Sequence, residues 1–166
     1  MSNRPDLLRR AQKYCEENGL LLGAPLGSGI HGSVFVVESQ TERGRSAIKV
    51  HEHERYFCRE RDVYLRLAAW EVTDIRGCAV PEMLRHDDGL WVIEMTVVTR
   101  PFVLDFAGAH LDRPPDFSED VLADWRAEKH EQFGPRWPHV QAILRDLEGF
   151  GVFMSDVNPG NISFGD

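Results

Sequence analysis

The chain has 166 residues, 42% of them hydrophobic, so it can bury a core and is not disordered over its whole length. Its net charge of −8, from 19 Lys and Arg against 27 Asp and Glu, argues against nucleic-acid binding, which needs clustered basic residues. Three widely spaced cysteines exclude a disulfide framework or a cysteine zinc site. With no signal-peptide pattern and no membrane-spanning apolar run, the sequence predicts a cytoplasmic protein without membrane contact.

The first predicted element is an amphipathic helix over residues 3–18. Asn3 can cap its first turn and Gly19 can end it. Apolar residues recur at helical spacing along one face, at Leu7, Leu8, Ala11, Tyr14 and Cys15. We therefore expect residues 1–19 to form an N-terminal helix that packs on the body of the protein.

Short β-rich runs separated by turn residues follow from Leu20 onwards. We expect strands at 20–22, 33–37, 46–50, 82–86 and 90–98, with one helix inserted at 54–70. The fourth and fifth runs are joined by Asp87-Asp88-Gly89, which is a hairpin signal. Residues 20–99 are therefore predicted to form a five-stranded antiparallel sheet with one helix.

After Pro101 the pattern becomes helical. Ser118 can cap a helix that ends near Phe133, and a second helix is expected at 138–150. A loop and a short strand at 161–164 complete the chain. The sequence thus predicts an α+β fold of two lobes joined near residues 94–100, with a reduced helical lobe over 100–166.

The first motif that carries chemistry is Gly27-Ser28-Gly29-Ile30-His31-Gly32-Ser33-Val34, which reads G-x-G-x-x-G-x-V. Glycines let a turn lie close to phosphates, so that backbone N–H groups can face the phosphate oxygens. In a dinucleotide-binding fold such glycines open a helix, whereas here a strand is predicted next. The hairpin setting favours a phosphate-covering loop of the kinase type.

Two charged residues follow at the spacing that such a loop requires. Lys49 lies in the third predicted strand, within Ala47-Ile48-Lys49-Val50, and Glu60 lies on the next helix, one turn before Tyr64. An exposed strand lysine and a solvated helix face are the alternative interpretations. The functional interpretation is that Lys49 binds phosphates and that Glu60 pairs with it.

The fourth motif is Ser155-Asp156-Val157-Asn158-Pro159-Gly160-Asn161, which reads D-x-x-x-x-N between a predicted helix and a predicted strand. With the motifs before it, in this order, it resembles the protein-kinase-like superfamily. Its Asn-Pro-Gly centre is most similar to small-molecule kinases of the aminoglycoside-phosphotransferase type.

The resemblance implies ATP and Mg²⁺ as cofactors and a protein or small-molecule hydroxyl as the acceptor. It assigns catalytic roles to Asp156, Lys49 and Glu60, and a magnesium-binding role to Asn161. The ATP-binding residues that it implies are Gly27, Ser28, Gly29, Gly32, Val34, Ala47, Lys49, Glu94 and Met95.

One departure from the family pattern concerns the second metal-binding aspartate, which should follow the catalytic loop by a strand. Asp166 stands only five residues beyond Asn161, too few for a strand to leave, turn and return. We therefore expect Asp166 to be a turn or tail residue, with a role as a substitute metal ligand as the alternative. The histidines of His51-Glu52-His53 lack a third ligand at useful spacing, so we expect them to be exposed.

Two functions remain open from the sequence. One is an ATP-dependent phosphotransferase. The other is a catalytically impaired pseudokinase that acts as a nucleotide-binding regulatory or protein-interaction module. In either case a partner protein, or a second copy of the chain, is expected to cover the reduced lobe, because a truncated lobe leaves apolar surface exposed.

Overall fold

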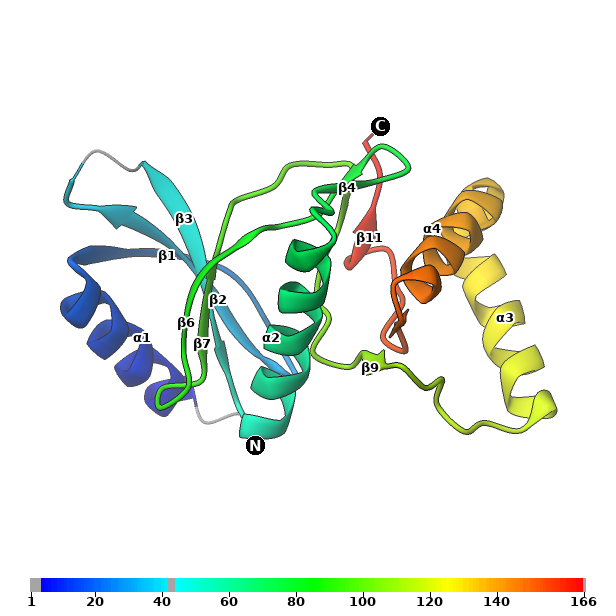
Figure 1. The fold of residues 1–166 in the computed structure, drawn as a ribbon, viewed down its shortest axis with the longest axis horizontal. Helices are drawn as coiled ribbons and strands as arrows, with labels where there is room; N and C mark the ends of the chain where they lie inside the picture. Colours follow the sequence, from blue (N-terminus) through cyan, green and yellow to red (C-terminus); the bar gives the residue numbers. More distant parts are fainter. Residues whose placement is uncertain (1–3, 42–43, 166) are drawn as a thin grey trace.

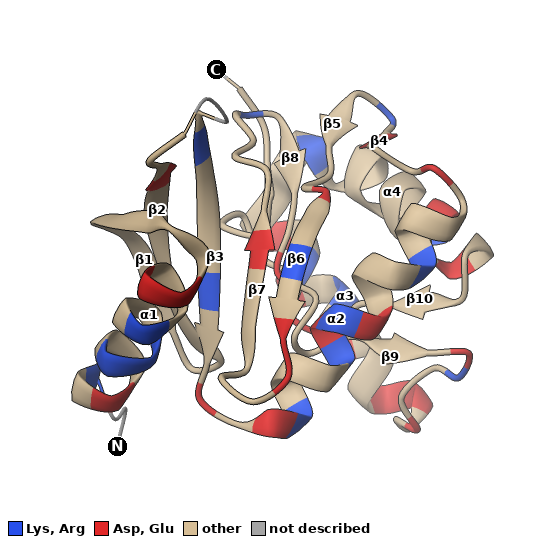
Figure 2. Cartoon of the chain, turned by 60° about the vertical axis from the view of Figure 1, so that its left-hand side comes forward, with Lys and Arg blue, Asp and Glu red and all other residues tan. Residues whose placement is uncertain are grey.

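A computed structural model describes residues 4–41 and 44–165. The largest of the three sheets in these residues has five strands in the order β1-β2-β3-β7-β6, and every neighbouring pair is antiparallel. Figure 2 shows these strands side by side. Their bounds are Leu20–Gly29 for β1, Gly32–Ser39 for β2, Arg45–His51 for β3, Met83–Asp87 for β6 and Val92–Met95 for β7.

Helix α1 (Arg4–Asn18) packs against strands β1, β2 and β3 (Figure 1). Its apolar stripe buries Leu7, Ala11, Tyr14 and Cys15, as the helical spacing predicts, while Leu8 remains exposed. The expected cap, Asn3, lies outside the described residues. The stripe belongs to a hydrophobic cluster that also contains Leu20, Phe35, Val37, Ile48, Val50, Leu90 and Val92.

Helix α2 (Glu54–Ala69) packs against β3, β6 and β7. Strand β3 contributes to both hydrophobic clusters, because successive side chains point to opposite faces of a sheet. Ile48 and Val50 join the cluster at α1, whereas Ala47 belongs to the second cluster, with Phe57 of α2. The second cluster continues into the C-terminal part of the chain, so the two predicted lobes share one core.

The remaining elements carry the chain from the sheet to the C-terminal helices. They are β4 (Asp74–Ile75), β5 (Cys78–Ala79), β8 (Phe102–Val103), β9 (His110–Leu111), α3 (Glu119–Phe133), the 3₁₀-helix η1 (Gly134–Arg136), α4 (Trp137–Gly149), β10 (Val152–Phe153) and β11 (Ile162–Ser163). Four of the short strands form a sheet in the order β11-β8-β5-β4, and β9 pairs with β10. The five-stranded sheet, the four-stranded sheet and the C-terminal helices lie in succession along the longest axis of the molecule (Figure 1).

The structure confirms the mixed α+β class and the five-stranded antiparallel sheet. It corrects two boundaries. The helical pattern expected directly after Pro101 is wrong, because residues 102–111 contain β8 and β9. The first strand extends to Gly29, so the glycine-rich motif forms the ends of β1 and β2 with a two-residue turn between them. Among the described residues, none of the helices combines the length and apolarity needed to cross a membrane.

Candidate functional site

A cleft of about 650 Å³ lies between the glycine-rich hairpin, strands β3 and β7, and the segments that contain Asp105 and Asp156. It collects most of the residues singled out in the sequence. The predicted residues that line it are Gly27, Ser28, Gly29, Gly32, Val34, Ala47, Lys49, Glu60, Met95, Asp156 and Asn161. Motifs that are far apart in the chain therefore surround one cavity.

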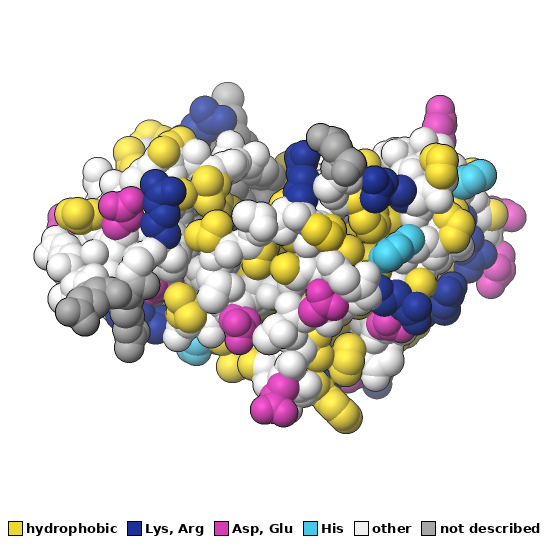
Figure 3. Space-filling view, turned by 90° about the horizontal axis from the view of Figure 1, so that it is seen from above, with side chains coloured by type: hydrophobic (Ala, Val, Ile, Leu, Met, Phe, Trp, Pro, Cys, Tyr) yellow, Lys and Arg dark blue, Asp and Glu magenta, His cyan; other side chains and the backbone are white. Residues whose placement is uncertain are grey.

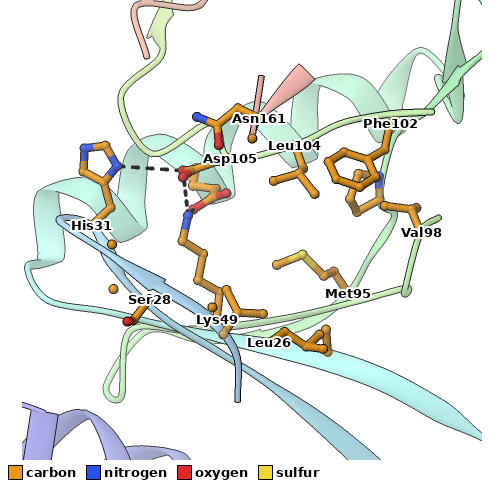
Figure 4. A pocket seen from close by; sticks show the side chains of 18 of the residues that line it. Leu26, Ser28, His31, Lys49, Met95, Val98, Phe102, Leu104, Asp105 and Asn161 are labelled. Carbon is orange, nitrogen blue, oxygen red and sulfur yellow. Dashed lines mark hydrogen bonds and ion pairs between the residues drawn. The ribbon is translucent and has the colours of Figure 1, made fainter. Parts of the chain in front are cut away.

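The cleft has a polar part and an apolar part (Figure 4). Lys49, Asp105 and His31 lie close together in the polar part, with Asn161 beside them. The apolar part is lined by Leu26, Met95, Val98, Phe102 and Leu104. This division suits a ligand that has one apolar, flat portion and one polar portion.

Lys49 lies in the polar part between two carboxylates. Its Nζ is 2.8 Å from Oε2 of Glu60 and 2.7 Å from Oδ1 of Asp105. Burial alone would lower the pKa of Lys49, but the two carboxylates outweigh burial and hold the pKa above its usual value. The side chain is therefore a fixed positive charge, almost withdrawn from solvent.

Glu60 is held in place through both of its oxygens. Oε2 forms an ion pair with Nζ of Lys49 and accepts a hydrogen bond from Nε2 of His51 at 2.6 Å, while Oε1 accepts one from the backbone N–H of Phe106. Burial would raise the pKa of Glu60, but Lys49 and His51 together lower it to about 2. The expectation of an exposed His51 is wrong. His51 is buried, because Glu60 of α2 packs against the imidazole and bonds to its Nε2.

Asp105 is the residue that the sequence analysis missed. It follows β8, which pairs antiparallel with β11, the strand that comes directly after Asn161. The backbone N–H of Leu104 also donates to the carbonyl oxygen of Asn161. Asp105 has a φ of 66°, a conformation that is unfavourable for a non-glycine residue and that is concentrated at functional sites.

An aspartate therefore lies beside Lys49 although it precedes the 155–161 motif in the chain. The available signal was the Asp105-Phe106 pair, because a kinase-type D-F-G also begins with Asp-Phe. Asp166, the downstream candidate, lies outside the described residues.

The segment 155–161 is ordered by its own side chains. Oδ1 of Asn158 accepts hydrogen bonds from the N–H groups of Gly160 and Asn161. Nδ2 of Asn158 donates to Oδ1 of Asp156, and Nδ2 of Asn161 donates to the backbone oxygen of Asp156. These bonds orient Asp156 and leave the side-chain oxygen of Asn161 available as a ligand.

Glu94 does not line the cleft, although it was expected to do so. Its carboxylate accepts hydrogen bonds from Tyr14, Ser46 and Arg85. Because Tyr14 belongs to α1, Glu94 lies on the face of the sheet that α1 covers. Its neighbour Met95 faces the cleft instead, as the alternation of side chains along a strand requires.

The described residues around the cleft offer several groups that could hold a metal ion. His31, Asp105 and Asp156 can each place one ligand atom within 4.8 Å of the others. The side-chain oxygen of Asn161 is a further oxygen donor on the same cleft. Elsewhere, on the face seen from above, charges of both signs are interspersed and form no continuous basic surface (Figure 3).

Comparison of the chain with protein-family models, with curated proteins and with solved structures finds no match.

Proposed function

We propose that the cleft binds ATP with magnesium and transfers the γ-phosphoryl group to a hydroxyl acceptor, in the manner of protein-kinase-like phosphotransferases. The observation that carries the proposal is the position of Lys49. Its ammonium is buried between Glu60 and Asp105 beneath a glycine-rich hairpin, beside an apolar compartment. Kinases use this combination to hold the phosphates of ATP.

The two parts of the cleft match the two parts of a nucleotide. Leu26, Ala47 and Met95 supply apolar surface for a purine ring, and the hairpin backbone can approach the phosphates closely because its glycines lack side chains. A Cβ atom added at Gly27 or Gly29 would meet no atom within 4 Å, so the space over these glycines is open to a ligand.

The donor set beside Lys49 fits magnesium, which prefers oxygen ligands. Asp105 and Asn161 would hold the ion, since the Asn161 amide nitrogen is already used and its oxygen is not. Bound there, magnesium would neutralise charge on the phosphates. The chain order differs from the kinase pattern, in which the aspartate follows the catalytic loop. The β8–β11 pairing supports the same spatial role for Asp105.

Asp156 would receive the proton of the acceptor hydroxyl. Its side chain is 39% exposed, so an acceptor can reach it, and Asn158 fixes one of its oxygens. The bond between the γ-phosphorus and the bridging oxygen of the β-phosphate breaks, and a bond to the hydroxyl oxygen forms. The hydroxyl proton passes to the Asp156 carboxylate, and ADP leaves.

The alternative is a regulatory module that binds nucleotide without turnover. Asp105 favours the phosphotransferase over this alternative, because it places a carboxylate 2.7 Å from Lys49. The covering partner also stays a prediction. Phe117 and Val121 are each about half exposed, and the apolar surface that they form at the start of α3 supports the prediction of a covering partner.

The first test is ADP binding, measured by titration calorimetry with and without magnesium. Replacing Lys49 with Met should weaken ADP at least tenfold, because a hydrogen bond to a charged group contributes about 1.5–3 kcal/mol. Lys49→Arg keeps the charge but not the geometry and should give an intermediate loss. Lys13→Met, on the exposed face of α1, is the matched control and should change nothing. Absence of nucleotide binding by folded wild-type protein would refute the proposal.

The second test separates binding from chemistry. Asp156→Asn should retain ADP affinity within about threefold and lose transfer of labelled γ-phosphate to hydroxyl acceptors, because only proton acceptance is removed. Asp105→Asn should lose the magnesium-dependent part of nucleotide binding. If the wild-type protein binds nucleotide but transfers no phosphate, the regulatory module becomes the better description.

A further inference from the structure

His31 occupies an unusual place in the cleft. It lies in the two-residue turn between β1 and β2, and its side chain is only 9% exposed. The imidazole packs edge-on against Tyr56 of α2, with the ring centroids 4.6 Å apart. This packing directs the ring toward the polar part of the cleft (Figure 4). Turn residues usually lie at the protein surface, so the burial of the His31 side chain is unusual.

The ring nitrogen of His31 faces two carboxylates without bonding to either. Nδ1 is 3.8 Å from Oδ1 of Asp105 and 3.9 Å from Oδ2 of Asp156, which is beyond hydrogen-bonding distance. Within residues 4–41 and 44–165, neither nitrogen of this ring makes a hydrogen bond. An imidazole that is nine-tenths buried and makes no hydrogen bond keeps a ring nitrogen available to a ligand in the cleft.

These separations are those of ligands that share one ion. Two ligand atoms that are each about 2.1 Å from a metal lie about 3.0–4.2 Å apart, depending on the coordination angle. One atom from each of His31, Asp105 and Asp156 lies within 4.8 Å of the other two. The separations of 3.8 and 3.9 Å between Nδ1 of His31 and the two carboxylates fall within the range for ligands of one ion.

The charge of the site also favours a divalent cation. Lys49 pairs with the carboxylates of Glu60 and Asp105, and Asp156, beside His31, adds a third carboxylate, so the polar part of the cleft keeps an excess of negative charge. A nitrogen ligand beside two carboxylates selects among cations. Mg²⁺ and Ca²⁺ prefer oxygen ligands alone, whereas imidazole suits transition metals and zinc.

We propose that His31, Asp105 and Asp156 bind a divalent cation of the manganese and zinc class when no nucleotide is present. The metal would join the turn of the glycine-rich hairpin to the two carboxylates on the opposite wall of the cleft. The inference rests on the proposed function in using the same two carboxylates, but it requires no nucleotide and no phosphoryl transfer.

The test uses Mn²⁺ without nucleotide, with the free ion measured by its electron paramagnetic resonance signal. Metal-free wild-type protein should bind one Mn²⁺ per chain. His31→Ala and His31→Phe should each weaken Mn²⁺ at least tenfold, and the Phe variant retains an aromatic ring against Tyr56. His53→Ala is the matched control, because this exposed neighbour caps α2 without any side-chain hydrogen bond. It should bind Mn²⁺ as the wild type does.

Mg²⁺ affinity should change less than threefold in the His31 variants, since magnesium gains little from an imidazole ligand. Equal Mn²⁺ affinity in the wild type and both His31 variants would overturn the inference, as would a wild type that binds no Mn²⁺ at about 1 mM. Titration with ADP separates the two proposals. His31-dependent Mn²⁺ binding without ADP affinity refutes only the proposed function, whereas ADP affinity with Mn²⁺ binding independent of His31 refutes only this inference.

Discussion

The buried carboxylate of Glu60 allows a prediction of how the free energy of unfolding changes at acidic pH. Its pKa is lowered from 4.5 to about 2, and each pKa unit corresponds to about 1.36 kcal/mol. Because the pKa is depressed in the folded state, the contribution is complete above pH 4.5 and is lost as the pH falls toward 2. The network of Lys49, His51 and Phe106 around Glu60 thus contributes about 3 kcal/mol to the free energy of unfolding near neutral pH.

Glu60→Gln removes this titration and leaves Lys49 with Asp105 as its remaining carboxylate. We expect the variant to be less stable than the wild type by about 3 kcal/mol at pH 6, and the difference in the free energy of unfolding to narrow by roughly 1 kcal/mol at pH 3.5. Urea denaturation at both pH values measures the difference. Glu16→Gln, at an exposed position of α1, controls for the loss of one negative charge.

The reasoning fails if the stability difference between the wild type and Glu60→Gln is the same at pH 6 and at pH 3.5. It also fails if the difference at pH 6 is below about 1 kcal/mol, the size of an exposed ion pair.

Other predictions separate structural from ligand-binding roles. Gly32→Ala should destabilise the protein by about 2 kcal/mol or more in urea denaturation, because its Cβ atom would lie 2.1 Å from the carbonyl oxygen of Val50. Gly29→Ala meets no atom, so it should leave stability within about 0.5 kcal/mol and weaken ADP binding in calorimetry; a reversed pattern would contradict the assignment of the hairpin. Glu94→Gln should cost about 1.5–3 kcal/mol through its bond to Arg85 and leave ADP affinity unchanged. Weaker ADP binding by the Glu94→Gln variant would support the original prediction that Glu94 belongs to the nucleotide-binding site.

The residues of the cleft that could be predicted from the sequence lie in short, local sequence motifs. The glycine-rich hairpin, Lys49 and Asp156 each lie in a motif of fewer than ten residues, flanked by elements with clear periodicity. Their assembly into one cleft required only that these elements form as expected. Glu60 was found in the same way, since helical spacing places it one turn before the buried Tyr64.

The parts that were missed depend on contacts between distant segments. Asp105 reaches the cleft because Val103 pairs with Ile162, although α3 and α4 lie between these residues in the sequence. Strands of only two residues show no periodicity that a sequence pattern could reveal. The burial of His51 likewise follows from a contact with α2, and the displacement of Glu94 follows from α1. Alternation within a strand gives two faces but does not say which one the ligand uses.

The pairing of β8 with β11 also sets the order in which the cleft can be completed during synthesis. A nascent chain exposed up to residue 150 already contains Lys49, Glu60 and Asp105. It lacks the strand Ile162–Ser163 that aligns β8. Asp156 and Asn161 arrive in the same short stretch. Strand β11 and the residues proposed for catalysis are therefore synthesised together, within residues 155–163. The cleft can be completed only after this segment has left the ribosomal exit tunnel.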